Sequence, residues 1–398
     1  METFNGKLVL SAAEMQMDPE LDSREVMGQD AQMFPGVTLE FFTHDGDLVP
    51  VTREVITPSG EAAQNSYWQI IVQPGKVWSE PGDEGWSRAS FPFALVNRLE
   101  TDTHNGVATF LYKDGEVSDV RFQITQQTAP YYIATHFQAW GTLPAAYDPA
   151  DASKYAEERR AYAVELDDRI ETAKWGELAA GPHEAAALHG FEGETSSEYV
   201  VMHALVRDGV LYYQPSATPQ GPFPYPTRMR FGVWSVTKSV GPALGMLRLA
   251  EKYGDWVFNL ELLDGTSTST PRMTAWEGVT FGDALNMATG LGGGNIQANP
   301  NNIYVDYTFG GSYDEWYRAR SEAEKVAMLD KVGNYPWGPG EVVRYRDRDM
   351  FSLGVAMDNF LKSRRGRGRK HLAHGRERGA RTHRYPSRTH EHDLRGRR

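Results

Sequence analysis

The sequence predicts an α+β protein in which an all-β domain is followed by a domain rich in helices. Residues 34–145 contain short runs of alternating apolar and polar residues, separated by turn dipeptides such as Asp45-Gly46 and Asp114-Gly115, as in antiparallel strands. Beyond residue 150, apolar residues recur at helical spacing, first in residues 152–175 and again in residues 235–250. A group of strands followed by a group of helices is typical of the α+β class.

Length and composition fit a globular chain with two domains. The chain has 398 residues, of which 40% are hydrophobic and 12% aromatic, enough for two sizeable cores. No apolar run approaches the roughly 18 residues of a membrane span, and residues 1–20 lack the basic start and apolar stretch of a secretion signal. The absence of cysteine excludes disulfides, thiol catalysis and cysteine metal sites. The oligomeric state stays open.

The first domain is expected to cover residues 34–145, after an N-terminal extension of residues 1–33. Its predicted strands are residues 37–42, 68–73, 106–112, 120–125 and 131–138, and Asn105-Gly106 is expected to form a further turn. Its aromatic residues include Phe41, Phe42, Trp68, Trp78, Trp86, Tyr131, Tyr132 and Trp140. We expect them to fill the core of a sandwich or barrel; the alternative is that they line a ligand groove.

The second domain, residues 151–361, is expected to begin with an amphipathic helix over residues 152–175, whose buried face carries Tyr155, Tyr162, Val164, Leu166 and Ile170. His183-Glu184 and His189 follow, but their spacing misses the His-Glu-x-x-His pattern that puts two zinc ligands on one helical face. We therefore predict no metal site, and we predict no cofactor. Residues 199–213 form a predicted hairpin around Asp208-Gly209.

The strongest chemical signal is Ser235, with Lys238 three residues later at the start of a predicted helix. Residues three apart share a helical face, so the lysine amino group is expected beside the serine hydroxyl. A serine becomes an effective nucleophile when a neighbouring base takes its proton, and free N–H groups at a helix start favour the oxyanion formed in its attack on a carbonyl. The alternative is an ordinary capped helix. The face expected to be buried carries Val236, Val240, Ala243, Leu244 and Leu247.

Residues 231–238, Phe-Gly-Val-Trp-Ser-Val-Thr-Lys, resemble the approach and active-site helix of the serine β-lactamase and penicillin-binding protein superfamily. The closest likeness is to the branch of class C β-lactamases, D-Ala-D-Ala carboxypeptidases and related esterases. The hairpin before Ser235, and residues 276–291 with their Thr-Gly-Leu ending, follow the order of elements in that superfamily. The resemblance covers roughly residues 197–361, and it implies a partial β-lactamase-like domain with helices on an antiparallel sheet.

A second box supports this resemblance. Residues 342–347, Val-Val-Arg-Tyr-Arg-Asp, follow a Pro-Gly turn and resemble the superfamily's box that usually reads Tyr-x-Asn. The resemblance implies that Tyr345 shares proton transfer with Lys238, and that Asp347 takes the substrate-contacting position of the asparagine. An aspartate keeps a hydrogen-bond acceptor there but lacks the amide donor. The alternative for Tyr345 is a buried core phenol.

The last segment differs in composition from everything before it. Residues 362–398 hold 14 of the 41 Lys and Arg residues and 3 of the 53 Asp and Glu residues, which leaves +11 here and −23 in the acidic body. Such a body repels nucleic acid and anionic membranes, so neither is expected as its partner. The segment lacks apolar periodicity and is predicted to be disordered. We favour a frameshift product over an RNA-binding or nuclear-targeting arm.

The superfamily's third box, Lys or His followed by Ser/Thr-Gly, does not occur after Tyr345. The resemblance therefore implies that the C-terminal strands are missing and that the chain is inactive as written. The predicted function is a β-lactamase-related serine hydrolase that forms an acyl-enzyme on Ser235 with an ester, a β-lactam or a D-amino-acid peptide. The alternative is a non-catalytic carbohydrate- or peptide-binding protein that uses the aromatic residues of the β domain. The resemblance implies a periplasmic or extracellular location, although no signal peptide is visible.

Overall fold

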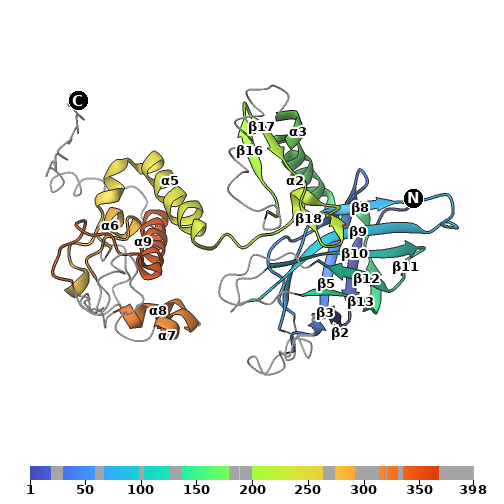
Figure 1. Ribbon diagram of the computed structural model, residues 1–398, viewed down its shortest axis with the longest axis horizontal. Helices are drawn as coiled ribbons and strands as arrows, with labels where there is room; N and C mark the ends of the chain where they lie inside the picture. The colour runs from blue at the N-terminus through green and yellow to red at the C-terminus, as the bar shows by residue number, and fades with distance from the viewer. Residues whose placement is uncertain are drawn as a thin grey trace, which may run out of the picture. The chain divides into compact units, whose positions relative to one another are not determined.

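The computed structural model describes residues 1–18, 30–58, 67–97, 103–125, 137–178, 188, 200–262, 274–291, 313–319, 321–329 and 335–366. It has the mixed α+β composition predicted from the sequence, with a large antiparallel sheet and several helices (Figure 1). The chain divides into two compact units, Met1–Trp234 and Ser235–Arg398, and each is described by itself.

The first unit is built on a twelve-stranded antiparallel sheet. In spatial order its strands are β14 (Ala145–Pro149), β1 (Gly6–Leu10), β5 (Val37–His44), β6 (Asp47–Pro50), β8 (Gly75–Trp78), β9 (Ser87–Val96), β10 (Thr103–Lys113), β12 (Val120–Ile124), β13 (Gln138–Leu143) and β3 (Gln16–Asp18). Beside this path, β7 (Gln69–Val72) pairs with β9, and β11 (Glu116–Val117) pairs with β10.

The sheet curls until its two ends meet. Only Pro144 separates β13 from β14, yet β13 pairs with β12 at one end of the sheet and β14 pairs with β1 at the other. Residues 11–15 likewise link β1 to β3, which pairs with β13. Because so short a link spans at most roughly 20 Å, the two ends lie close together and the sheet encloses a single interior.

Aromatic side chains fill that interior, as the core interpretation predicted for Phe41 and Trp68, which are both fully buried. Phe91, Phe93 and Phe110 join them in one hydrophobic cluster. Trp140 differs, because it is 41% exposed on β13. Trp78 and Trp86 are half-buried, whereas Tyr131 and Tyr132 lie outside the described residues.

Two strands from residues 1–33, β1 and β3, belong to the large sheet, so the prediction of an N-terminal extension was wrong. Phe4 and Leu8 are fully buried in the core, and β1 has a strand on each side, with Leu8 opposite both Leu39 and Tyr147. The pattern of this strand is only five residues long, and its partners are distant in the sequence. A strand this short, whose partners are far away in the sequence, is difficult to recognise from the local pattern of apolar residues.

Three of the four dipeptides that were predicted to form turns do so. Asp45-Gly46, Asp114-Gly115 and Asp208-Gly209 each have two consecutive positive φ angles, as the two-residue turns of hairpins require. Asn105-Gly106 instead lies inside β10. A Cβ atom on Gly106 would lie 2.6 Å from the ring of Phe93 and 2.7 Å from a backbone oxygen, so this glycine permits close packing rather than a turn.

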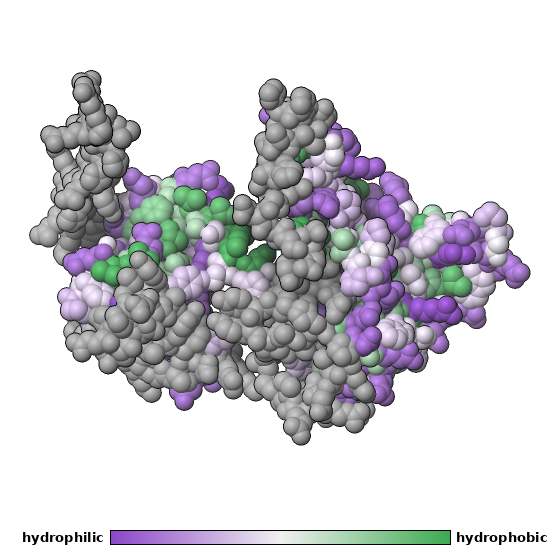
Figure 2. Space-filling model, viewed as in Figure 1, coloured by the Kyte–Doolittle hydropathy of each residue, from purple (hydrophilic) through white to green (hydrophobic). Residues whose placement is uncertain are grey.

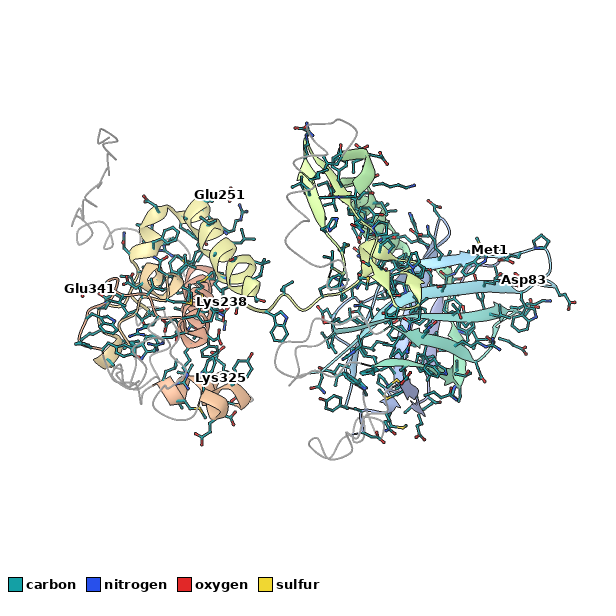
Figure 3. The ribbon with its side chains drawn as sticks, viewed as in Figure 1. Met1, Asp83, Lys238, Glu251, Lys325 and Glu341 are labelled. Carbon is teal, nitrogen blue, oxygen red and sulfur yellow. The ribbon has the colours of Figure 1, made fainter. Side chains whose placement is uncertain are left out.

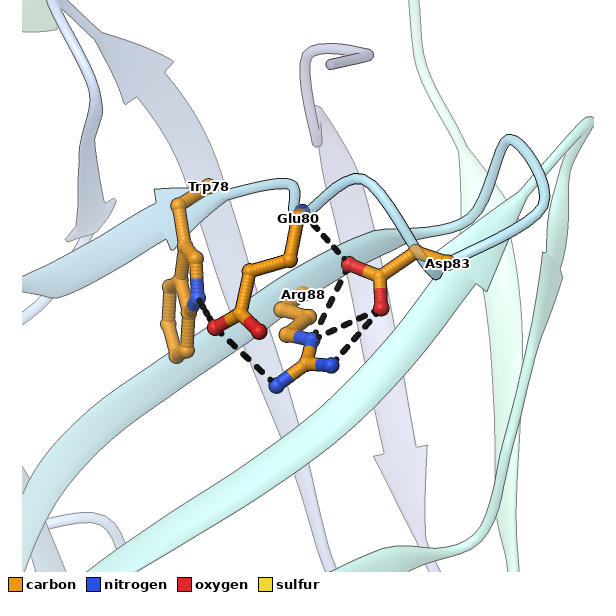
Figure 4. A network of polar contacts seen from close by, with 4 residues as sticks. All are labelled: Trp78, Glu80, Asp83 and Arg88. Carbon is orange, nitrogen blue, oxygen red and sulfur yellow. Dashed lines mark hydrogen bonds and ion pairs between the residues drawn. The ribbon is translucent and has the colours of Figure 1, made fainter.

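A surface network closes the loop between β8 and β9 (Figure 4). Arg88 donates to both carboxylate oxygens of Asp83 at 2.7–3.1 Å, and the same carboxylate accepts the backbone N–H of Glu80 at 2.7 Å. The hydrogen bonds from Arg88, and to a smaller extent the one from Glu80, hold the pKa of Asp83 below its ordinary value. Glu80 also accepts from the Trp78 indole at 3.2 Å, so the network ties both strands to the loop.

Helix α2 (Ala156–Asp167), after a 3₁₀ turn at Ala152–Tyr155, packs on the sheet. Tyr155 and Tyr162 are buried against Phe42 and Val49, which are two of the sheet's buried residues outside the main core. The predicted helix over residues 152–175 was too long, since α2 ends at Asp167. The predicted face was also partly wrong, because Val164 is 58% and Ile170 43% exposed.

The remaining elements of the first unit are short. β15 (Glu171–Lys174), β17 (Val210–Tyr213) and β16 (Ala204–Arg207) form a three-stranded sheet, β18 (Ala217–Thr218) pairs with β19 (Gly221–Pro222), β2 (Ala13–Glu14) pairs with β4 (Met33–Phe34), and α3 (Trp175–Leu178) follows β15. The predicted hairpin is confirmed, with Arg207 opposite Val210. These elements cluster with the large sheet, whereas the sequence predicted a domain boundary near residue 151.

The second unit is built from α5 (Leu244–Tyr253), α6 (Phe281–Leu285), α7 (Tyr313–Arg318), α8 (Glu322–Leu329) and α9 (Asp347–Gly366). Its core includes Met246 and Leu249 from α5, Phe281 from α6 and Leu353 from α9. None of the helices in the described residues is long and apolar enough to cross a membrane.

Helix α9 continues past Leu361, so the predicted disorder was wrong for residues 362–366. Lys362 forms an ion pair with Asp358 one turn earlier, and the Arg364 guanidinium lies 5.0 Å from the ring centre of Phe360. Both contacts stabilise the last turns of a helix. The rest of the basic segment, residues 367–398, lies outside the described residues.

Helix α5 and the turn before it present apolar side chains to solvent. Val236, Val240, Leu244 and Leu247 are 56–59% exposed, and apolar surface is visible over this helix (Figure 2). The face predicted to be buried is therefore an exposed one. The buried face contains Met246 and Leu249 instead, so this helix is apolar on both sides.

Candidate active site

The chain that leads to Ser235 is held on the large sheet of the first unit. The side-chain amide of Asn105 donates to the backbone oxygen of Arg230 and accepts its backbone N–H, both at 2.8 Å. Tyr225 donates to Ser90 Oγ at 2.9 Å. The approach predicted from the sequence is thus fixed by two side-chain contacts up to Arg230.

Ser235 lies in a 3₁₀ turn, Trp234–Val236, at the head of the helical segment that becomes α5. Trp234, directly before it, has a φ of 47°, which is rare for a bulky residue and costs conformational energy. The next segment, Ser239–Ala243, is π-helical and contains Pro242. A proline removes one N–H from a helix and clashes with the carbonyl four residues earlier, so the wider turn accommodates Pro242. Both irregularities are typical of functional sites.

Lys238 and Ser235 are in direct contact, as their spacing predicted. Lys238 Nζ donates to Ser235 Oγ at 3.1 Å and to the hydroxyl of Tyr345 at 2.9 Å. Lys238 lies directly before the π-helical segment that leads into α5 (Figure 3). Its partners Tyr345 and Asp347 lie just before and at the first residue of α9. The Lys238 side chain is 15% exposed, whereas Ser235 itself is exposed to solvent. The amino group of Lys238 therefore contacts both a solvent-exposed serine hydroxyl and a phenol.

Asp347 completes this cluster. Its carboxylate forms an ion pair with Lys238 Nζ, and its side chain is 27% exposed. Burial alone would lower the pKa of Lys238, but hydrogen bonds to Asp347 and Tyr345, together with the negative charge of Asp347, outweigh burial and raise that pKa above its ordinary value. The lysine is accordingly an ammonium ion at neutral pH.

Backbone contacts with the segment after α6 position Tyr345 and Asp347. Met287 and Ala288 accept the backbone N–H groups of Arg344 at 2.8 Å and Gly340 at 2.7 Å. Asp347 is the first residue of α9, where a helix favours negative charge. The segment after α6 is the Thr-Gly-Leu region singled out in the sequence, so two motifs hold each other in place.

A buried contact between the same two motifs was not predicted. Thr289 Oγ1 donates to Asp349 Oδ2 at 3.1 Å, and Asp349 also pairs with Arg346 at 3.4 Å. Asp349 is fully buried, two residues beyond Asp347. The alternation of charged residues from Arg344 to Asp349 is visible in the sequence, but it does not reveal which of them point inward.

All four residues named from the sequence, Ser235, Lys238, Tyr345 and Asp347, thus lie together in the second unit. Tyr345 is half-buried, and its hydroxyl accepts a hydrogen bond from Lys238. The alternative of a tyrosine buried in the core does not describe this environment. Within the described ranges, no group of three or more His, Asp or Glu residues is placed to hold a metal ion. His183, Glu184 and His189 lie outside those ranges.

Comparison of the chain with protein families, curated proteins and solved structures identified no similar protein. The chain matches no protein-family model, and neither the curated proteins nor the solved structures contain a significant match to it.

Proposed function

We propose that this chain is a serine hydrolase of the β-lactamase-related kind, which transfers an acyl group to Ser235 and then to water. One observation carries the proposal: the amino group of Lys238 contacts both a solvent-exposed serine and the phenol of a residue 107 positions later. Such an arrangement of nucleophile and proton-transfer groups is what covalent catalysis requires.

The residues divide the chemistry as follows. Lys238, in its free-amine form, takes the proton of Ser235 while Ser235 Oγ bonds to the substrate carbonyl carbon. The resulting ammonium ion returns that proton, directly or through the Tyr345 hydroxyl, to the leaving oxygen or nitrogen as its bond to carbon breaks. Water then attacks the acyl-serine, gives its proton to Lys238, and Ser235 leaves with a proton from the same group.

The substrate class follows from the nucleophile and the resemblance. An ester, a β-lactam or a peptide ending in a D-amino acid each presents a carbonyl that an activated serine attacks. The backbone N–H groups at the start of the helical segment are the donors available to the developing oxyanion. Asp347 offers a substrate only an acceptor, and that acceptor is already engaged with Lys238.

Covalent labelling tests this proposal because it records the acylation of Ser235 alone, and does not need the turnover that the absence of the third box is expected to prevent. The full chain is incubated with a fluorophosphonate or with penicillin, digested, and searched by mass spectrometry for the modified residue. We expect the adduct on Ser235 and none in Ser235→Ala. The matched control is Ser239→Ala, which removes an exposed hydroxyl one turn along the same helix and should leave labelling unchanged. Undiminished labelling in Ser235→Ala would refute the proposal.

A further inference from the structure

The contacts of Lys238 fit an ammonium ion. Its Nζ atom has three acceptors within bonding distance, namely Ser235 Oγ at 3.1 Å, the Tyr345 hydroxyl at 2.9 Å and the Asp347 carboxylate. An ammonium group has three N–H bonds and no lone pair, so each proton has one acceptor. One of these acceptors is an anion.

The free amine needed for catalysis fits the same positions in a different way. It has two N–H bonds, which can point at Tyr345 and Asp347, and one lone pair, which can face the hydroxyl proton of Ser235. Both protonation states are therefore accommodated without movement. The negative charge of Asp347 favours the ammonium form over the amine, and thus opposes the state that activates Ser235.

Other charged groups on the packed elements have contacts of their own. Lys238 immediately precedes the π-helical segment Ser239–Ala243, which packs against α5 and α9. On α5, Arg248 pairs with Glu251; at the start of α9, Arg346 pairs with Asp349, and Arg348 lies 5.3 Å from the ring centre of Trp316. Asp347 and Tyr345 are the groups that act directly on Lys238.

We infer that Asp347 sets the pH at which Ser235 becomes a nucleophile, by holding Lys238 as an ammonium ion until the solution is alkaline. Asp347 is a positioning residue in this scheme, since it acts through Lys238. The inference rests on the proposed serine hydrolase function. This role also gives a function to the aspartate that stands where the resembled box has asparagine. An asparagine at position 347 would keep the hydrogen bond to Lys238 without the charge.

The test compares Asp347→Asn with the unchanged chain. The rate of phosphonylation of Ser235 by a fluorophosphonate is measured from pH 6 to pH 11, and the titration of Lys238 is followed by competitive acetylation, with the exposed Lys252 as internal reference. In Asp347→Asn the midpoint of the rise in both measurements should move to lower pH by about one pH unit or more. At pH 7 the variant should then be labelled about tenfold faster, because the free-amine fraction changes tenfold per pH unit.

Two further variants serve as controls. Asp347→Glu keeps the charge and should keep a high midpoint. Asp358→Asn removes a carboxylate from the same helix, where it pairs with Lys362 on the surface, and should leave both curves unchanged. The unchanged chain gives a measurement that needs no variant: Lys238 should titrate above the ordinary lysine value of about 10.4.

The outcomes separate the inference from the function on which it rests. A Lys238 midpoint at or below the ordinary value in the unchanged chain, or identical pH profiles of phosphonylation in the chain and in Asp347→Asn, would overturn the role of Asp347 alone. A lysine titration that shifts as expected, with no phosphonylation of Ser235 in either protein at any pH, would overturn the serine hydrolase and the inference with it.

Discussion

Lys238 is the residue through which the other members of the candidate site act on each other. Ser235, Tyr345 and Asp347 all contact its amino group, so each substitution around it tests a different part of the mechanism. Removing the amine removes the proposed base. Removing the phenol hydroxyl leaves the base in place but deletes one path for its proton.

For the lysine and the tyrosine we expect losses of similar order. Lys238→Ala and Tyr345→Phe should each lower the rate of Ser235 acylation by roughly 10²–10⁴-fold, the usual contribution of a positioned acid or base. The double variant should lose less than the product of the two, because groups that act as one unit are not additive. The check is the rate of fluorophosphonate labelling in the three variants, and an unchanged rate in Tyr345→Phe would leave the tyrosine only a packing role.

The sequence predicted these residues because their signals are local. Ser235 and Lys238 are three residues apart, so their spacing alone predicts their contact. Tyr345 was named only by resemblance, and the structure places its hydroxyl on Lys238. The ion pair between Lys238 and Asp347 is different. It depends on how the start of α9 lies against the segment at Ser235, and no local pattern contains that distance.

At the scale of elements, the helical segment at α5 shows where periodicity fails. Apolar residues lie on two sides of this helix, and the sequence pattern at Val236, Val240, Leu244 and Leu247 selected the side that is exposed. When a helix carries apolar residues on two sides, the pattern does not indicate which side the core uses. The Asn105-Gly106 dipeptide failed similarly, since glycine serves both turns and close packing.

Replacing a leucine with alanine on each face of α5 in turn distinguishes the buried face from the exposed one. Leu249→Ala removes a side chain that is 4% exposed, and Leu247→Ala removes one that is 59% exposed. The first should lower the free energy of unfolding by about 2–5 kcal/mol, as buried leucine truncations do, and the second by at most about 0.5 kcal/mol. Urea unfolding of both variants measures the difference. A loss at Leu247 equal to that at Leu249 would mean that another layer covers the exposed face.

At the scale of the whole molecule, the large sheet organises the first unit. Its strands pair across long sequence distances, such as Gly6 with Pro149, and the closure of the sheet follows from two short links at Pro144 and residues 11–15. Sequence patterns predicted several of the strands but not their order, because pairing partners are chosen by packing over the whole unit. The same reason explains why β1 was taken for an extension.

The last prediction is that residues 1–234 fold without the rest of the chain. Among the described residues, the core of the closed sheet and the cluster under α2 consist of residues from this unit, and the sheet is continuous through β14 and β1. The fragment should therefore unfold cooperatively on heating, with Trp68, which is fully buried, giving a blue-shifted fluorescence that is lost in the same transition.

A shorter fragment, residues 1–143, supplies the control. It lacks β14, which pairs with β1 along its whole length, and it lacks α2, whose Tyr155 and Tyr162 cover Phe42 and Val49. Opening the sheet leaves unpaired backbone groups on β1 and exposes apolar surface, so this fragment should aggregate or melt at a clearly lower temperature. Equal melting temperatures for the two fragments would show that closure by β14 contributes nothing, and an unfolded fragment 1–234 would show that its core depends on residues beyond Trp234.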